Sequence, residues 1–215
     1  MMLLKFTKRL SRFLATSVLL AVPLLSKANV YTLVPHPSQT DRGVVTVQEF
    51  FWYSCPHCYQ LEPKLDEWIH RLPKNVKMEI IPAVTNTYWR RMAILYYSLQ
   101  ELGQMSRLHK KIFEAQHISH TNLYDADVLK QFLEENGVSW DKYQKAANSF
   151  GVITKVSRSE ALVKNYNISG VPSFVVDGRY LVSIETAGSE SELFKALDET
   201  IKMARKNSEK IAKAK

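Results

Sequence analysis

The two cysteines of the chain, Cys55 and Cys58, are separated by Pro56 and His57. An apolar run from Val44 to Phe51 leads into them, and a helix-compatible segment follows. This pattern predicts a buried strand, a sharp turn and a helix whose first turn carries both sulfurs. Unpaired backbone N–H groups and the positive end of the helix dipole favour a thiolate there. We therefore expect a reactive Cys55, with Cys58 as the resolving thiol.

The two residues between the cysteines fit the same chemistry. Pro56 suits the first helical position, where its missing N–H has no partner to lose. His57 can bring a donor and a partial positive charge to the sulfur of Cys55. Because these features stabilise the reduced form, they predict a disulfide that readily oxidises other thiols.

Glu49 is out of place in the otherwise apolar strand, six residues before Cys55. It is either an exposed residue at the edge of a sheet or a buried acid beneath the dithiol. In the second case burial raises its pKa, and the carboxyl group can exchange protons with Cys58.

Other uses of a cysteine pair fit less well. A structural zinc site needs four ligands, and the histidines outside the motif are scattered, at His36, His70, His109, His117 and His120. We therefore predict no metal. A covalent haem site needs a histidine directly after Cys58, where the chain has Tyr59. A purely structural disulfide across so short a loop constrains the unfolded chain very little.

The 215 residues, of which 46% are hydrophobic and 23% charged, are typical of a globular protein with an ample core. Residues 1–28 contain no acid and supply five of the eight net positive charges. The basic character is thus largely a property of the N-terminus, and we predict no binding to nucleic acid.

Residues 1–28 are predicted to be a secretory signal peptide. A basic start precedes an apolar stretch, Phe13 to Leu25, that is too short for a comfortable membrane span. Small residues at Ser26 and Ala28 predict cleavage between Ala28 and Asn29. Pro23 and the short apolar run argue against an uncleaved anchor. Export to an oxidising compartment agrees with the low cysteine count.

The remaining chain divides by its patterns into four parts. Residues 29–85 carry the cysteine motif and a second strand, Val76 to Ala83. Residues 86–166 have helical patterns only, over Thr87–Leu102, Met105–His117, Asp125–Asn136, Ser139–Phe150 and Val152–Tyr166. Residues 167–205 contain a hairpin of Phe174–Val176 and Tyr180–Val182 and a final helix, Ser189–Arg205. Residues 206–215 are expected to be a solvated basic tail.

Two motifs and their order identify a resemblance. Cys55-Pro56-His57-Cys58 follows Glu-Phe-Phe, and Gly170-Val171-Pro172-Ser173-Phe174 precedes the hairpin. Pro63 also matches, since thioredoxins carry a proline at this offset in the active-site helix. Over about residues 44–205 the chain resembles the DsbA family of thioredoxin-fold periplasmic thiol:disulfide oxidoreductases. The resemblance implies an α/β thioredoxin fold with an inserted all-helical subdomain.

The resemblance also assigns roles to residues. It implies a cis peptide bond between Val171 and Pro172, packed against the dithiol, and a Val171 backbone that pairs with bound peptide. It places Glu49 on the buried acid of the family and Glu62 on an acid near the active-site helix. Ile80 stands where some relatives have a buried lysine, so a pair between Glu49 and a lysine is not expected.

The implied function is thiol:disulfide interchange, in which the Cys55–Cys58 disulfide oxidises cysteine pairs of unfolded or partly folded exported proteins. The disulfide itself is the redox group, and no bound cofactor is expected. A quinone-linked membrane protein would reoxidise the pair, in the periplasm, and the protein would be a monomer. Two alternatives stay open. One is a disulfide isomerase or reductase of the same fold, although 29–43 is too short for a dimerisation segment. The other is a peptide-binding chaperone with an incidental dithiol.

Overall fold

A computed structural model of the protein describes residues 29–39 and 43–213. The predicted signal peptide, including Ala28 on one side of the predicted cleavage point, lies outside the described residues. In the described part of the chain, no helix combines the length and the apolar character needed to cross a membrane.

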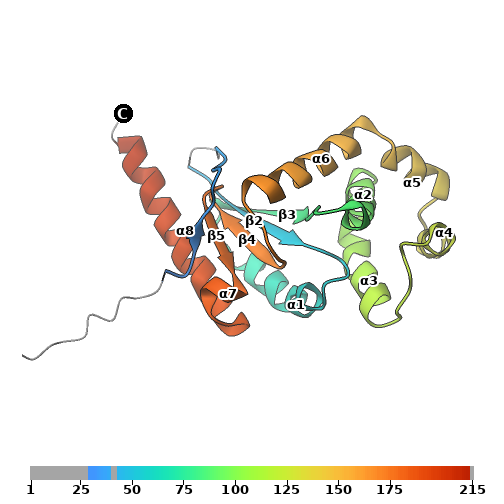
Figure 1. Ribbon diagram of the computed structural model, residues 1–215, viewed down its shortest axis with the longest axis horizontal. Coiled ribbons are helices and arrows are strands. Elements are labelled where there is room, and N and C mark those ends of the chain that lie inside the picture. Colours follow the sequence, from blue (N-terminus) through green and yellow to red (C-terminus); the bar gives the residue numbers. More distant parts are fainter. Residues whose placement is uncertain (1–28, 40–42, 214–215) are drawn as a thin grey trace, which may run out of the picture.

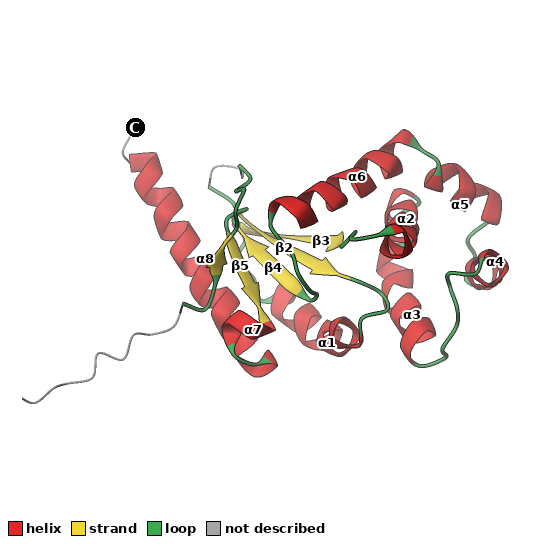
Figure 2. Cartoon of the chain, viewed as in Figure 1, coloured by secondary structure: helices red, strands yellow, loops and turns green. Residues whose placement is uncertain are grey.

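A mixed sheet of five strands forms the centre of the protein (Figures 1 and 2). In space the strands follow the order β1-β5-β4-β2-β3. Their bounds are Thr32–Leu33 for β1, Val45–Phe51 for β2, Val76–Pro82 for β3, Ser173–Val176 for β4 and Tyr180–Ser183 for β5. β2 and β3 are parallel, whereas the β2–β4, β4–β5 and β1–β5 pairs are antiparallel. The strand that leads into the cysteines is therefore covered on both edges.

Helices cover both faces of the sheet (Figure 1). α1 (Pro56–His70) and α8 (Glu190–Lys213) pack on one face, against Val45 and Val47 of β2, and α6 (Phe150–Asn165) packs on the other, against Phe50. Side chains alternate along a strand, so Glu49 points to the same face as Val47, toward α1.

Four further helices lie between β3 and α6 in the chain and beyond one end of the sheet in space (Figure 1). They are α2 (Thr87–Glu101), α3 (Met105–His117), α4 (Ala126–Glu135) and α5 (Trp140–Ala147). Their apolar core is continuous with Phe51, Tyr53 and both cysteines. The dithiol therefore lies at the junction between the sheet and these helices.

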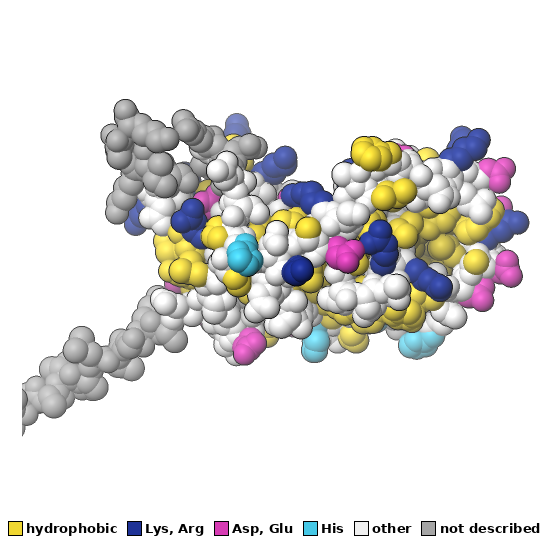
Figure 3. Space-filling model, turned by 45° about the horizontal axis from the view of Figure 1, so that its top comes forward, with side chains coloured by type: hydrophobic (Ala, Val, Ile, Leu, Met, Phe, Trp, Pro, Cys, Tyr) yellow, Lys and Arg dark blue, Asp and Glu magenta, His cyan; other side chains and the backbone are white. Residues whose placement is uncertain are grey.

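Hydrophobic side chains gather on the half of the surface that holds these helices, between scattered lysines and arginines (Figure 3). Large exposed hydrophobic residues of this half include Tyr88, Ile118, Phe150 and Ile153.

Some predicted helix boundaries differ from the structure; for example, α5 ends at Ala147 and not at Phe150. α6 begins at Phe150, because Ser149 caps it by accepting a hydrogen bond from the Val152 amide at 3.1 Å. A short helix, α7 (Ile184–Ala187), follows β5 and was not predicted; Ser183 and Thr186 cap each other there. α8 continues to Lys213, past the predicted end at Arg205, because no glycine or proline interrupts the sequence in this stretch.

Candidate active site at the Cys55–Cys58 pair

The turn between β2 and α1 holds the two cysteines as the sequence predicts. Cys55 is the N-cap residue of α1, with extended backbone angles, and Pro56 occupies the first helical position. The amide of Cys58, in the first turn, donates to the Cys55 sulfur at 3.4 Å. The side chain of Cys55 thus takes the place that a serine or aspartate oxygen usually has at a helix N-terminus.

The two sulfurs differ in their surroundings. Cys55 is 7% exposed and Cys58 only 1%. The Cys58 thiol, which donates to the Cys55 sulfur, has the largest effect and lowers the pKa of Cys55. Burial opposes this, while the backbone N–H groups of Cys58 and His57 and the charge of His57 lower the pKa further, to about 6. Burial raises the pKa of Cys58 far above the ordinary value of a thiol, and the contact with Cys55 adds to that. This arrangement favours the thiolate form of Cys55 and the protonated form of Cys58.

The segment before β4 lies against the sulfur of Cys55. The peptide bond between Val171 and Pro172 is cis, as predicted. The Cys55 sulfur lies 3.4 Å from the carbonyl oxygen of Val171, to which it donates. Pairing of β4 with β2, with Ser173 opposite Phe50, brings this segment to the end of the cysteine strand. The two motifs, which lie 116 residues apart in sequence, therefore form one site.

Glu49 is buried, with 1% of its surface exposed, so the alternative of an exposed edge position is wrong. Its neighbours on the adjacent strands are Ile80 of β3 and Phe174 of β4, and its Oε2 atom has no hydrogen-bond partner among the described residues. Burial, and secondly the negative charge of Glu62, raise the pKa of Glu49 well above its usual value. A carboxyl group of this kind can hold a proton close to Cys58.

One residue of the site was not predicted. His109 of α3 approaches Tyr53 with Nδ1, at 2.8 Å from the hydroxyl oxygen, and Glu62 with Nε2, at 3.4 Å from Oε1. We grouped His109 with the scattered histidines because the sequence alone does not show that α3 lies against α1. A signal was present: His109 lies on the apolar stripe of its helix, between Met105 and Phe113.

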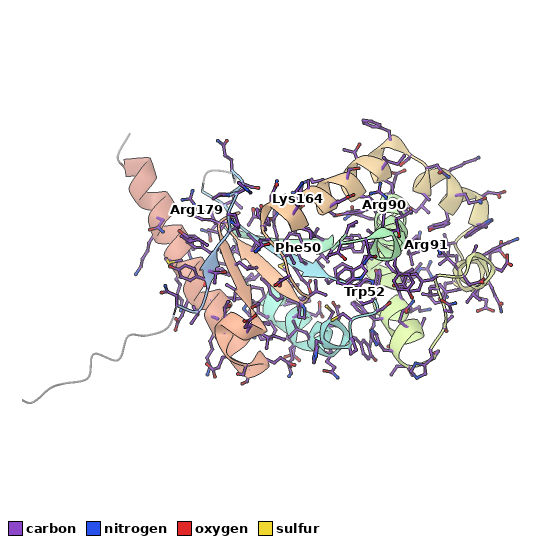
Figure 4. All side chains as sticks on the ribbon, in the orientation of Figure 1. Phe50, Trp52, Arg90, Arg91, Lys164 and Arg179 are labelled. Carbon is purple, nitrogen blue, oxygen red and sulfur yellow. The ribbon has the colours of Figure 1, made fainter. Side chains whose placement is uncertain are left out.

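Four aromatic side chains form two stacked pairs near the cysteine turn. Trp52 stacks on Trp89, with 4.4 Å between ring centroids, and Tyr88 stacks on Tyr124 at 3.7 Å. The hydroxyl of Tyr124 accepts from the Trp52 indole at 3.1 Å and lies 2.8 Å from the hydroxyl of Ser54. Figure 4 shows Trp52 where the sheet meets the helical insert. These aromatic residues contact the cysteine turn through Trp52 and Ser54, a set that the sequence could not single out.

No group of three or more metal-binding side chains occurs within residues 29–39 and 43–213.

Comparison with known proteins agrees with this geometry. The model of a family described as the DSBA-like thioredoxin domain matches residues 75–198. The thiol:disulfide interchange protein DsbA of Azotobacter vinelandii is 33% identical over 173 residues, covering 80% of this chain and 81% of the relative. DsbA of Bordetella parapertussis is 34% identical over 205 residues, covering 91% and 97%. The chain belongs to the DsbA family of thioredoxin-fold thiol:disulfide oxidoreductases.

Solved structures of DsbA proteins match the fold. The crystal structure of Pseudomonas aeruginosa DsbA superimposes with a TM-score of 0.78 and 31% identity, covering 84% of this chain and 95% of that one. DsbA from Xylella fastidiosa gives 0.74 and 28%, covering 81% and 95%. The predicted thioredoxin fold with a helical insert is therefore confirmed. As in the rest of the DsbA family, the redox group is the pair Cys55–Cys58, without a bound cofactor.

Proposed function

We propose that this protein oxidises cysteine pairs of unfolded or partly folded exported proteins through its Cys55–Cys58 disulfide. The observation that carries the proposal is the position of Cys55 at the N-terminus of α1, where it accepts from the Cys58 amide and its pKa falls to about 6. A thiolate stabilised in this way is a good leaving group, and its disulfide is a good oxidant.

The exchange proceeds in two steps. A substrate thiolate attacks the Cys55 sulfur, the bond between Cys55 and Cys58 breaks, and Cys58 leaves as a thiolate that takes up a proton. A second thiolate of the same substrate then attacks the substrate sulfur of the mixed disulfide, and Cys55 leaves as a thiolate. The substrate has lost two electrons and formed a disulfide, and the Cys55–Cys58 pair has gained them.

Nearby residues support these steps in different ways. We assign Pro56 and His57 to the stabilisation of the Cys55 thiolate. Glu49, which is buried and protonated well above the usual carboxyl range, supplies the proton that Cys58 needs. We assign the backbone of Val171, beside the Cys55 sulfur, and Pro172 to the binding of an extended substrate segment.

We also propose where the protein acts and which kind of protein reoxidises it. Cleavage between Ala28 and Asn29 would release the protein into the periplasm. Each turnover leaves Cys55 and Cys58 reduced, so a second protein must take their electrons. We propose a quinone-linked membrane protein for that role, acting on a monomer.

The reduction potential of the pair tests this function. Free thiols are counted by alkylation after equilibration in glutathione buffers of graded ratio. A potential above about −180 mV supports an oxidase, while one near −270 mV, which is typical of reductases, contradicts it. Cys55→Ser separates the chaperone alternative: an oxidase loses activity and keeps peptide binding, whereas a chaperone keeps its activity.

A further inference from the structure

Two carboxyl groups lie on the Cys58 side of α1. Glu49 approaches from β2 and is fully enclosed, while the side chain of Glu62 comes from α1 and is 23% exposed. The two are close enough for the charge of Glu62 to raise the pKa of Glu49. The residues opposite Glu49 on the adjacent strands are Ile80 and Phe174, so no cation lies directly across from it in the sheet.

α3 lies next to α1 (Figure 1) and brings an imidazole to these acids. The side chain of His109 is 16% exposed, and its Nε2 atom is buried. Nε2 lies 3.4 Å from Oε1 of Glu62, which is ion-pair distance without the alignment of a hydrogen bond. Because a carboxylate oxygen can only accept, the tautomer of His109 that suits this contact has its hydrogen on Nε2.

The other side of the imidazole is held in place. Nδ1 lies 2.8 Å from the hydroxyl of Tyr53, which is fully buried. Burial raises the pKa of Tyr53, so its hydroxyl stays protonated and can donate to Nδ1 or accept from it. The ring also meets Phe51, Tyr96 and Phe113 edge-on, at centroid distances of 5.2 to 5.9 Å. His109 therefore has one orientation, with Nε2 toward Glu62.

Three titratable groups face His109: Tyr53 from the turn after β2, Glu62 from α1 and Tyr96 from α2. Glu49 of β2 lies beyond Glu62. Within this cluster, His109 alone can carry a positive charge. Two neighbouring carboxyl groups without a cation share protons between them. A donor or positive charge beside one of two such carboxyl groups breaks that equivalence, because it favours ionisation of that group and leaves the proton on the other. In this cluster the donor is His109, which lies beside Glu62.

We propose that His109 is a positioning residue of the redox centre, which holds Glu62 as the charged member of the acid pair and so sets the protonation of Glu49. Glu49 in turn exchanges its proton with Cys58. The inference rests on the proposed proton exchange between Glu49 and Cys58, and it adds a residue of the helical insert to the chemistry.

Infrared spectroscopy of the reduced protein tests the proposal directly, because the carbonyl band of protonated Glu49 can be followed across pH. The band is assigned by its loss in Glu49→Gln. In His109→Asn a positive charge is removed and the bond toward Tyr53 can be kept, so the midpoint of the band should move up by roughly one pH unit. In Glu62→Gln a negative charge is removed, and the midpoint should move down. In the double variant the two shifts should cancel, and the midpoint of the Glu49 band should be close to that of the wild type. The four proteins together form a double-mutant cycle.

Two control variants distinguish a purely structural role of His109 from an effect on the protonation of Glu49. Tyr53→Phe removes the partner of Nδ1 and leaves both His109 and Glu62 in place, so the Glu49 midpoint should move less than in His109→Asn. His109→Gln is a second neutral variant, should His109→Asn fail to fold. An unchanged midpoint in the His109 variants, or shifts of the same sign in His109→Asn and Glu62→Gln, would overturn the proposal. Because the band reports protonation and not turnover, this result is independent of whether the protein is an oxidase.

Discussion

Replacing Glu49 with glutamine should make the protein more stable at neutral pH, by an amount that grows with pH. Glu49 is buried, and its Oε2 atom has no hydrogen-bond partner in the described part of the chain. Burial and, secondly, Glu62 raise its pKa well above 4.5. In the unfolded chain the carboxyl group ionises in its usual range. Above that range, folding therefore has to return a proton to Glu49 or bury its charge.

The sign and size of the effect follow from proton linkage. Between the unfolded and the folded pKa of Glu49, the folded state binds one more proton than the unfolded state, so stability falls as pH rises. The slope is about 1.4 kcal/mol per pH unit across that window. Glu49→Gln removes this slope, because glutamine does not titrate. The difference in unfolding free energy between variant and wild type should therefore rise with about that slope, starting near the usual carboxyl pKa.

Urea unfolding of the reduced proteins at a series of pH values measures the difference. Cys55 titrates in both proteins, so its direct contribution largely cancels. Glu67→Gln, which changes an exposed carboxylate on α1, is the matched control and should give a flat difference. A flat difference for Glu49→Gln would refute the reasoning, because it would mean that Glu49 ionises alike in the folded and unfolded chain.

Four further variants probe the dithiol and the stacked aromatic residues beside it. Cys58→Ala removes the thiol donor and should raise the pKa of Cys55 above about 6, while Cys58→Ser keeps a donor and should raise that pKa less. The ultraviolet absorbance of the thiolate measures the pKa in both variants. A larger rise in Cys58→Ser than in Cys58→Ala would contradict the hydrogen bond from Cys58 to Cys55. His57→Pro removes a backbone donor and a positive charge near Cys55, so the reduction potential of the pair should become less oxidising. An equal or more oxidising potential in glutathione buffers would contradict a role of His57 in stabilising the Cys55 thiolate. Tyr124→Phe leaves the Trp52 indole without its acceptor and should cost about 1 kcal/mol in urea unfolding, with no change in the Cys55 pKa.

The features that the sequence predicts well depend on local signals. The cysteine helix needs only an apolar strand, a cap position and a proline at the first turn, and all three lie within a few residues. The hairpin of β4 and β5 is marked by Asp177 and Gly178, which both adopt positive φ. Gly178 has a second reason to be glycine, since a Cβ atom there would lie 2.7 Å from the carbonyl oxygen of Ser38.

What the sequence could not decide depends on contacts between distant segments. Whether Glu49 is buried depends on the position of β2 in the sheet, and a strand pattern does not say that β3 and β4 cover both of its edges. The contact of His109 with Tyr53 spans 56 residues, and it exists only because α3 packs beside α1. The end of α8 differs for another reason: the lysines after Arg205 predict a solvated tail, although no residue in this run breaks a helix.

The pairing of β2 with β4 also determines when the redox centre is complete. A chain that emerges N-terminus first presents Cys55 and Cys58 long before Val171, which lies 116 residues later. Until β4 joins β2, the Cys55 sulfur lacks the Val171 carbonyl, and Glu49 lies at an open strand edge, where water can reach it. Such a molecule already has the start of α1, which lowers the pKa of Cys55, but it lacks the Val171 carbonyl and the strand that covers Glu49. The site is complete only when the last hairpin closes the sheet and brings Val171 to the Cys55 sulfur.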